Sequence, residues 1–155
     1  MNYSAHNKLV SFIWSIADDC LRDVYVRGKY RDVILPMVVL RRLDTLLEPS
    51  KEAVLEELRF QREEMDSFEL DNDALQAASG YVFYNTSKWT LRQIYNTATN
   101  NQQILLANIE EYLRGFSDNV KEIINRFKLA EQMRHMADKQ VLLDVWQVTA
   151  FDGMP

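Results

Sequence analysis

YRDVILPMVVLRRLDTLL, residues 30–47, is the stretch that decides the fold class, because it is long, strongly apolar and free of glycine. The polar side chains along it return every three to four residues and form one stripe, made of Arg41, Asp44 and Glu48. This spacing is typical of a helix that is buried on its other sides. Proline is tolerated in a first helical turn but disturbs a helix interior. We therefore predict a core helix that either starts near Asp32, as its N-cap, or is kinked at Pro36.

The segments on both sides of this stretch carry the same helical spacing of apolar residues. Before it, one apolar face runs from Leu9 to Cys20 and predicts a first helix that ends near Val26. After it, helices are predicted over residues 51–67, 74–79, 91–96, 101–115, 118–127 and 128–150. The N-caps expected for four of them are Ser50, Asp71, Thr90 and Ser117. In the segment 118–127, the residues expected to face inward are Val120, Ile123, Ile124 and Phe127.

Few residues in the chain favour strands or tight turns. Only four glycines and three prolines interrupt the 155 residues, which favours long helices. The one β-like run, residues 81–84, is too short to build a sheet and is expected to be extended or a minor strand. We predict one all-α domain over residues 1–155, an irregular bundle of about six to eight helices with at most one minor β-strand pair.

Charge and cysteine content bound the class of protein. The net charge is −5, and the acidity is confined to residues 49–80, which hold 3 basic and 9 acidic residues. A chain of this charge does not coat nucleic acid by bulk charge, although a local basic patch fits the first third. The single cysteine excludes an internal disulfide. The sequence shows no signal peptide and no apolar run of the ~20 residues that span a membrane. We expect a cytoplasmic protein without membrane contact.

No set of residues in the chain predicts a complete active site. The adjacent carboxylates, at Asp18-Asp19, Glu63-Glu64 and Glu110-Glu111, point about 100° apart on a helix and do not converge. His6 and His135 have no second ligand at metal-binding spacing. Cys20 lies on an apolar helix face, where a buried, inert thiol is expected. The glycines are isolated, so no phosphate-binding loop is present. We therefore predict no catalytic, cofactor-binding or metal-binding residue.

The one concentrated basic feature is the run of residues 27–31. Arg27, Lys29 and Arg31 surround Gly28 and the ring of Tyr30. Arginine and lysine neutralise phosphates, and a tight turn also presents backbone amides. These four side chains, Arg27, Lys29, Tyr30 and Arg31, are therefore candidates for binding DNA or a partner protein. The alternative is a polar loop that caps the first helix, with Tyr30 packed on the core.

Three stretches, taken together, resemble one protein family. They are residues 30–44 (YRDVILPMVVLRRLD), residues 83–91 (FYNTSKWTL) and residues 115–120 (GFSDNV), the last followed by the helix to Phe127 and the Leu142-Leu143 helix. In this order they resemble the N-terminal helical domain of the DNA-methylation (M) subunit of type I restriction–modification systems. The resemblance covers about residues 10–150.

The resemblance implies a function beyond what the residues themselves indicate. The full subunit would be an N6-adenine DNA methyltransferase that uses S-adenosylmethionine. Its partners would be DNA, one specificity subunit, a second methylation subunit and, in some assemblies, the restriction subunit. This domain would lie against the catalytic domain and help to close the complex around DNA. The family's cofactor loop and its Asn-Pro-Pro-Tyr/Phe motif, which holds a flipped adenine, are absent here. No catalytic or cofactor residue is therefore carried over, and residues 151–155 look like a cut within a longer protein.

Two other functions fit the sequence. A helical protein-interaction module without DNA contact is favoured by the acidic helix at 51–67 and the mild net charge. A helical DNA-binding regulator is ranked last, because no recognition helix rich in Arg, Asn and Gln stands out. The DNA target, the residues that contact partners, and the ability of the chain alone to dimerise or bind DNA stay open.

Overall fold

The structure, a computed structural model, describes residue 7 and residues 30–64, 69–98 and 101–150. Within these ranges the chain forms eight α-helices, one short 3₁₀ turn and no strand. The predicted all-α class is confirmed. The predicted first helix, apart from residue 7, lies outside the described residues. None of the described helices is long and apolar enough to cross a membrane.

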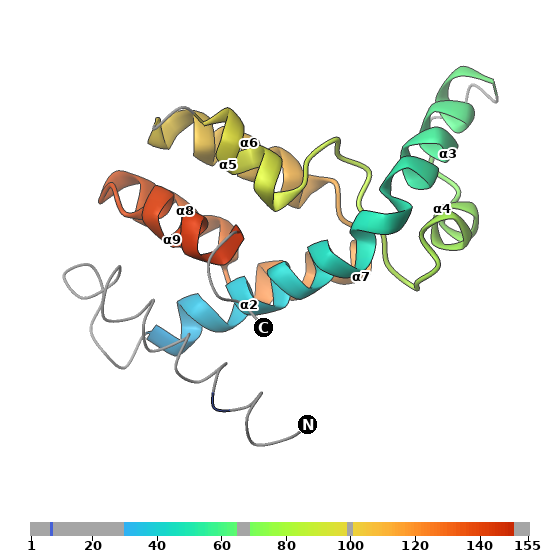
Figure 1. Cartoon of the computed structure of the whole chain (residues 1–155). Coiled ribbons are helices and arrows are strands. Elements are labelled where there is room, and N and C mark those ends of the chain that lie inside the picture. The colour runs from blue at the N-terminus through green and yellow to red at the C-terminus, as the bar shows by residue number, and fades with distance from the viewer. Residues whose placement is uncertain (1–6, 8–29, 65–68, 99–100, 151–155) are drawn as a thin grey trace.

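The apolar stretch at the centre of the sequence argument is the helix α2, Tyr30–Leu47. It begins before Asp32, so the prediction of Asp32 as N-cap is wrong, and Pro36 lies inside the helix. Its inward side chains, Met37, Leu40 and Leu47, are buried. Figure 1 shows α2 as a long helix along the lower side of the described helices. It therefore provides one long apolar surface on which the later helices pack.

An arm follows α2 and projects from the body of the molecule (Figure 1). It consists of the 3₁₀ turn η2, Glu48–Ser50, the helix α3, Lys51–Glu63, and the helix α4, Asn72–Ser79. The arm has a small core of its own, formed by Val54, Leu75 and Tyr84. The helix α4 is capped by the Asp71 side chain, as predicted. It ends at Gly80, which has a left-handed conformation.

Two polar side chains join the helices of the arm in ways that the sequence did not reveal. Ser50 lies at the N-cap position of α3, but its hydroxyl donates to the carbonyl of Ser79 at 2.9 Å and forms no cap bond. Gln61 is only 1% exposed, and its side-chain oxygen accepts from the Asp71 amide at 2.8 Å. Both bonds cross between α3 and α4, so they fix the angle of the arm's hairpin.

A tight connection leads from the arm back to the body. The run 81–84 is not a strand, and a single antiparallel bridge joins Asn85 to Phe116 instead. The chain turns at residues 85–87, where the Asn85 side chain accepts from the Ser87 amide at 2.8 Å. Gly115 packs so closely here that a Cβ atom on it would lie 2.7 Å from the Ser87 nitrogen. Only glycine allows the two backbones to approach in this way.

The body is built from two helix pairs that cover α2. The helix α5, Leu91–Thr97, packs on α9, Leu142–Ala150, and α6, Gln102–Arg114, packs on α8, Leu129–Asp138. The predicted cap of α5 is confirmed as a reciprocal capping box between Thr90 and Gln93. The fully buried side chains at the centre include Leu91, Ile94, Leu105, Ile109, Met133, Met136, Leu142, Val145 and Trp146.

The helix α7, Asp118–Arg126, corrects one prediction about which side chains face inward. Val120 and Ile124 are buried, as predicted. Ile123 and Phe127, however, are 48% and 42% exposed. The apolar stripe of α7 is wider than the surface that α6 and α8 cover, so its outer half is left open to solvent. Ser117 is at the N-cap position, but its hydroxyl makes no cap bond and instead accepts from the Tyr84 amide.

Candidate docking surface

The basic run predicted as a binding site falls mostly outside the described residues. Arg27 and Lys29 are not described, while Tyr30 and Arg31 form the start of α2, where only the backbone is described. The interpretation of these four residues as contacts for DNA or a partner therefore stays a prediction.

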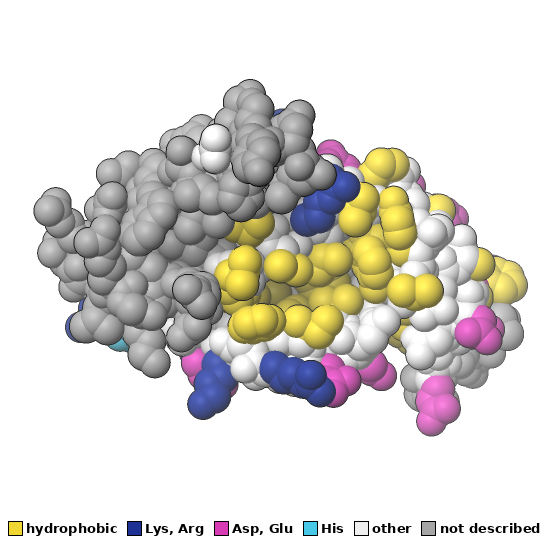
Figure 2. Space-filling view, turned by 90° about the horizontal axis from the view of Figure 1, so that it is seen from below, with side chains coloured by type: hydrophobic (Ala, Val, Ile, Leu, Met, Phe, Trp, Pro, Cys, Tyr) yellow, Lys and Arg dark blue, Asp and Glu magenta, His cyan; other side chains and the backbone are white. Residues whose placement is uncertain are grey.

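A groove between α2 and α7 is the most distinctive apolar surface in the described part of the chain. We call it the apolar groove, and its volume is about 300 Å³. Its lining is apolar except for Asn119, and consists otherwise of Pro36, Val39, Leu40, Leu43, Phe83, Val120, Ile123, Ile124, Phe127 and Leu129. Figure 2 shows hydrophobic side chains gathered on the lower face of the molecule, with charged side chains along the margin.

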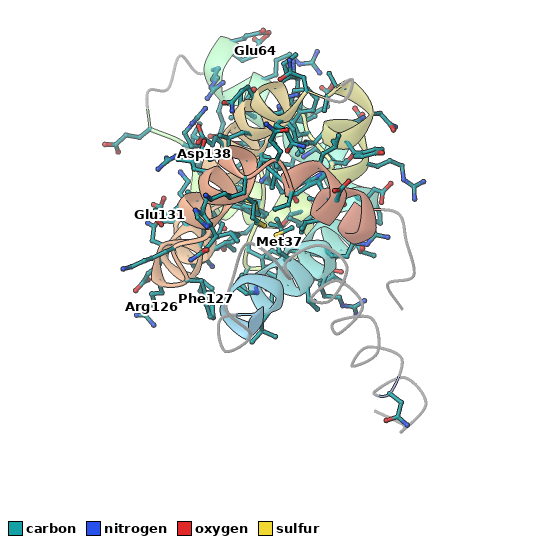
Figure 3. The ribbon with its side chains drawn as sticks, turned by 90° about the vertical axis from the view of Figure 1, so that its left-hand side faces the viewer. Met37, Glu64, Arg126, Phe127, Glu131 and Asp138 are labelled. Carbon is teal, nitrogen blue, oxygen red and sulfur yellow. The ribbon has the colours of Figure 1, made fainter. Side chains whose placement is uncertain are left out.

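Several side chains that line the apolar groove are much more exposed than side chains of the core. Val39 is 44% exposed on α2, and across the groove Ile123 and Phe127 are exposed to a similar degree. Phe127 lies at the edge of the molecule near α2, whereas Met37 of the same region points to the interior (Figure 3). A contiguous apolar patch with a polar margin is typical of a surface that another protein covers. The apolar spacing of α7 predicts an apolar stripe but does not show that half of it stays exposed.

A buried carboxylate, Asp44, organises the body behind the groove. The predicted polar stripe of α2 is wrong at this position, since Asp44 is only 6% exposed. Its Oδ1 accepts from the Leu91 amide at 3.2 Å and from the Tyr112 hydroxyl at 3.1 Å. The Leu91 amide belongs to the first turn of α5, where amides have no helical partner. Asp44 thus ties α2 to α5 and α6 and has a structural role.

Burial perturbs the ionisation of this cluster. Burial raises the pKa of Asp44 above its ordinary 3.8, while the bonds from Leu91 and Tyr112 act in the opposite direction. Burial, followed by the nearby Asp44, raises the pKa of the Tyr112 hydroxyl well above 10.0. Burial also lowers the pKa of Lys51 to about 8, against the attraction of Asp44. Groups with a shifted pKa often mark active sites. Asp44 and Tyr112, however, bond to each other inside the core, so their burial accounts for their shifted pKa values.

The described residues do not fit a cofactor or metal site. No group of three or more His, Cys, Asp or Glu side chains in the described ranges could hold a metal ion. A nucleotide-like cofactor is usually held by a glycine-rich loop at a helix N-terminus. Gly80 and Gly115, the glycines within the described ranges, instead end a helix and permit a close backbone contact. Neither of these two glycines forms such a loop.

Comparison with known proteins gives one match that spans nearly the whole chain. The family model described as the HsdM N-terminal domain matches residues 9–148. No curated protein and no solved structure matches the chain. The matched range contains all three stretches that carried the sequence resemblance, together with α2 to α8 and most of α9. The chain therefore belongs to the HsdM N-terminal domain family, the N-terminal domain of the methylation subunit of type I restriction–modification systems.

Proposed function

We propose that this chain is the assembly and DNA-clamping domain of an N6-adenine DNA methyltransferase subunit. The methyl transfer from S-adenosylmethionine would be carried out by a following domain. Membership in the methylation-subunit family supports this proposal. The observation that carries the assembly part is the apolar groove, where Val39, Ile123 and Phe127 are left open to solvent.

The occupant that we propose for the apolar groove is the catalytic domain of the same subunit. The matched family is by its description an N-terminal domain, so a further domain of the subunit is available at high effective concentration. An apolar surface of this kind gains stability when it is removed from water. The specificity subunit, the second methylation subunit and the restriction subunit would join at other surfaces.

Replacing Ile123 by aspartate is expected to abolish docking while leaving the fold intact. Ile123 is half exposed, so the carboxylate is solvated in the free chain but loses its water when the groove is covered. The test is co-elution of the chain with the separately produced catalytic part of the subunit. The matched control is Ile104→Asp, since Ile104 is 42% exposed on α6 and does not line the groove. If both variants co-eluted with the catalytic part to the same extent, the apolar groove would not be the docking surface.

The DNA-clamping part rests on the cations of residues 27–31. Reversing the charge at Arg27, Lys29 and Arg31 in the assembled methyltransferase is expected to weaken DNA binding. It should also flatten the dependence of binding on salt, because fewer counterions are released from phosphates. The measurement is a titration of duplex DNA at several salt concentrations. Unchanged affinity and slope would exclude this loop as a DNA contact.

A protein-interaction module without DNA contact is the second candidate. The acidic face of α3 supports it, since the exposed side chains there include Glu52, Glu56, Glu63 and Glu64. Absence of DNA binding by the chain at low salt, together with retained docking on the catalytic part, would favour this alternative.

A further inference from the structure

A second groove, on the other side of α7, is lined by cations. We call it the basic groove; its volume is about 300 Å³ and it lies between α6, α7 and α8. Its floor is formed by Leu113, Ile124 and Ala130, and its polar lining by Glu110, Arg114, Lys121, Asn125 and Arg134. Three cations and one carboxylate give these residues a net charge of +2, in a chain whose net charge is −5.

Two cations of the basic groove have no partner within the described part of the chain. Neither Arg114 nor Lys121 makes an ion pair or a side-chain hydrogen bond there. Other cations differ, because Arg59 and Arg126 are each paired with a glutamate one turn away on their own helix. The charges of Arg114 and Lys121 are therefore available to an anion from outside.

The third cation is held in place by an ion pair. Arg134 Nε donates to Glu110 Oε1 at 3.0 Å, a contact between α8 and α6. This contact uses one of the five N–H donors of a guanidinium, and the other donors stay directed to solvent or to a ligand. Glu110 thus orients Arg134 and removes only part of the positive charge of the groove.

We infer that the basic groove binds a phosphate of the DNA backbone, an inference that rests on the proposed DNA-clamping function. Two guanidinium groups and an ammonium carried by three packed helices suit a phosphate, which accepts several charge-assisted hydrogen bonds. The contact adds affinity and positions the duplex but reads no sequence. The lining of the basic groove includes none of residues 27–31, so the groove is a second candidate DNA contact in the same domain.

The test is DNA binding by the assembled methyltransferase that carries Arg114→Gln and Lys121→Gln together. The plot of log K against log salt has a negative slope, and its magnitude is expected to decrease by about 2. This is close to one unit for each cation that no longer neutralises a phosphate. The matched control is Arg62→Gln with Lys139→Gln, which removes the same charge from exposed sites outside the groove. Its slope should stay near that of the wild type. If the double variant proved poorly folded, Lys121→Gln alone should lower the slope by about 1.

The other possible outcomes show whether this inference, the proposed function or both fail. Equal slopes for the groove pair and the control pair would overturn the phosphate site. If the charge-reversed loop at residues 27–31 still weakened binding, the proposed function would stand without the groove. Absence of salt-dependent DNA binding by the wild-type assembly would end both. Loss of subunit assembly by the folded groove variant would identify the groove as a protein contact and overturn the inference.

Discussion

Trp146→Ala is expected to lower the free energy of unfolding by about 3–5 kcal/mol, the range measured for deletion of a buried aromatic side chain. Trp146 is fully buried in α9, and its indole Nε1 donates to the Leu91 carbonyl at 3.0 Å. Alanine would leave a cavity between α9 and α5 and would also remove the hydrogen bond from the indole to that carbonyl. A domain whose total stability is about 5–15 kcal/mol loses much of it through this one change. Urea denaturation followed by circular dichroism measures the loss.

Trp89 provides the control that separates the cavity from the hydrogen bond. Its indole nitrogen is buried and has no hydrogen-bond partner in the part of the chain that the structure describes. Trp89→Phe therefore loses volume but no hydrogen bond, whereas Trp146→Phe loses similar volume together with the bond to Leu91. The second variant should be the less stable by about 1 kcal/mol. Equal losses would show that the bond from Trp146 contributes nothing measurable.

Asp44→Ala is expected to lower the free energy of unfolding by about 2–6 kcal/mol, since two buried donors are left unsatisfied and each costs about 1–3 kcal/mol. The two donors are the Leu91 amide and the Tyr112 hydroxyl, both of which bond to the same carboxylate oxygen. Asp44→Asn retains an oxygen at this place and should restore most of the loss. An alanine variant as stable as the asparagine variant would contradict the role of Asp44 in joining α2 to α5 and α6.

Comparison of the wild type with Asp44→Asn at several pH values tests how the ionisation of Asp44 affects stability. Burial raises its pKa in the folded chain above the ordinary 3.8, so the folded state holds this proton more tightly than the unfolded state. The part of the stability that comes from this raised pKa is therefore complete below pH 3.8 and is lost as pH rises through the raised pKa. The wild type should lose stability relative to Asp44→Asn over that window. A stability difference that stays constant between pH 3.5 and about 7 would be the contrary result, because this range begins near the ordinary pKa of aspartate and extends well above it.

Caps and turns were predictable because they depend on residues that are close together in the chain. Asp71 and Thr90 each bond an amide three residues ahead, so a short window of sequence is sufficient to identify them. The same holds for Gly80, which is needed wherever a helix ends in a left-handed residue. The stretch at residues 30–44 also carried the family resemblance, which the family match confirms.

Ser50 and Ser117 show where local signals fail. Both occupy N-cap positions, as predicted, but their hydroxyls bond to residues about 30 positions away. A distant backbone group competes for the same hydroxyl, and only the folded chain decides which bond forms.

The helical class, the order of the helices from α2 to α7 and the family follow from the sequence, because helical periodicity and capping are local and the family stretches are continuous. The predicted helix 128–150 is in fact two helices, α8 and α9. The tertiary structure alone decided that Asp44 is buried and that Ile123 and Phe127 are exposed. Periodicity identifies an apolar or polar face but carries no information on how much of that face a neighbouring helix covers. The apolar groove is made by side chains from α2 and α7, which are far apart in the chain, so no window of sequence contained it. The basic groove is made by three consecutive helices, and only their packing brings its cations together.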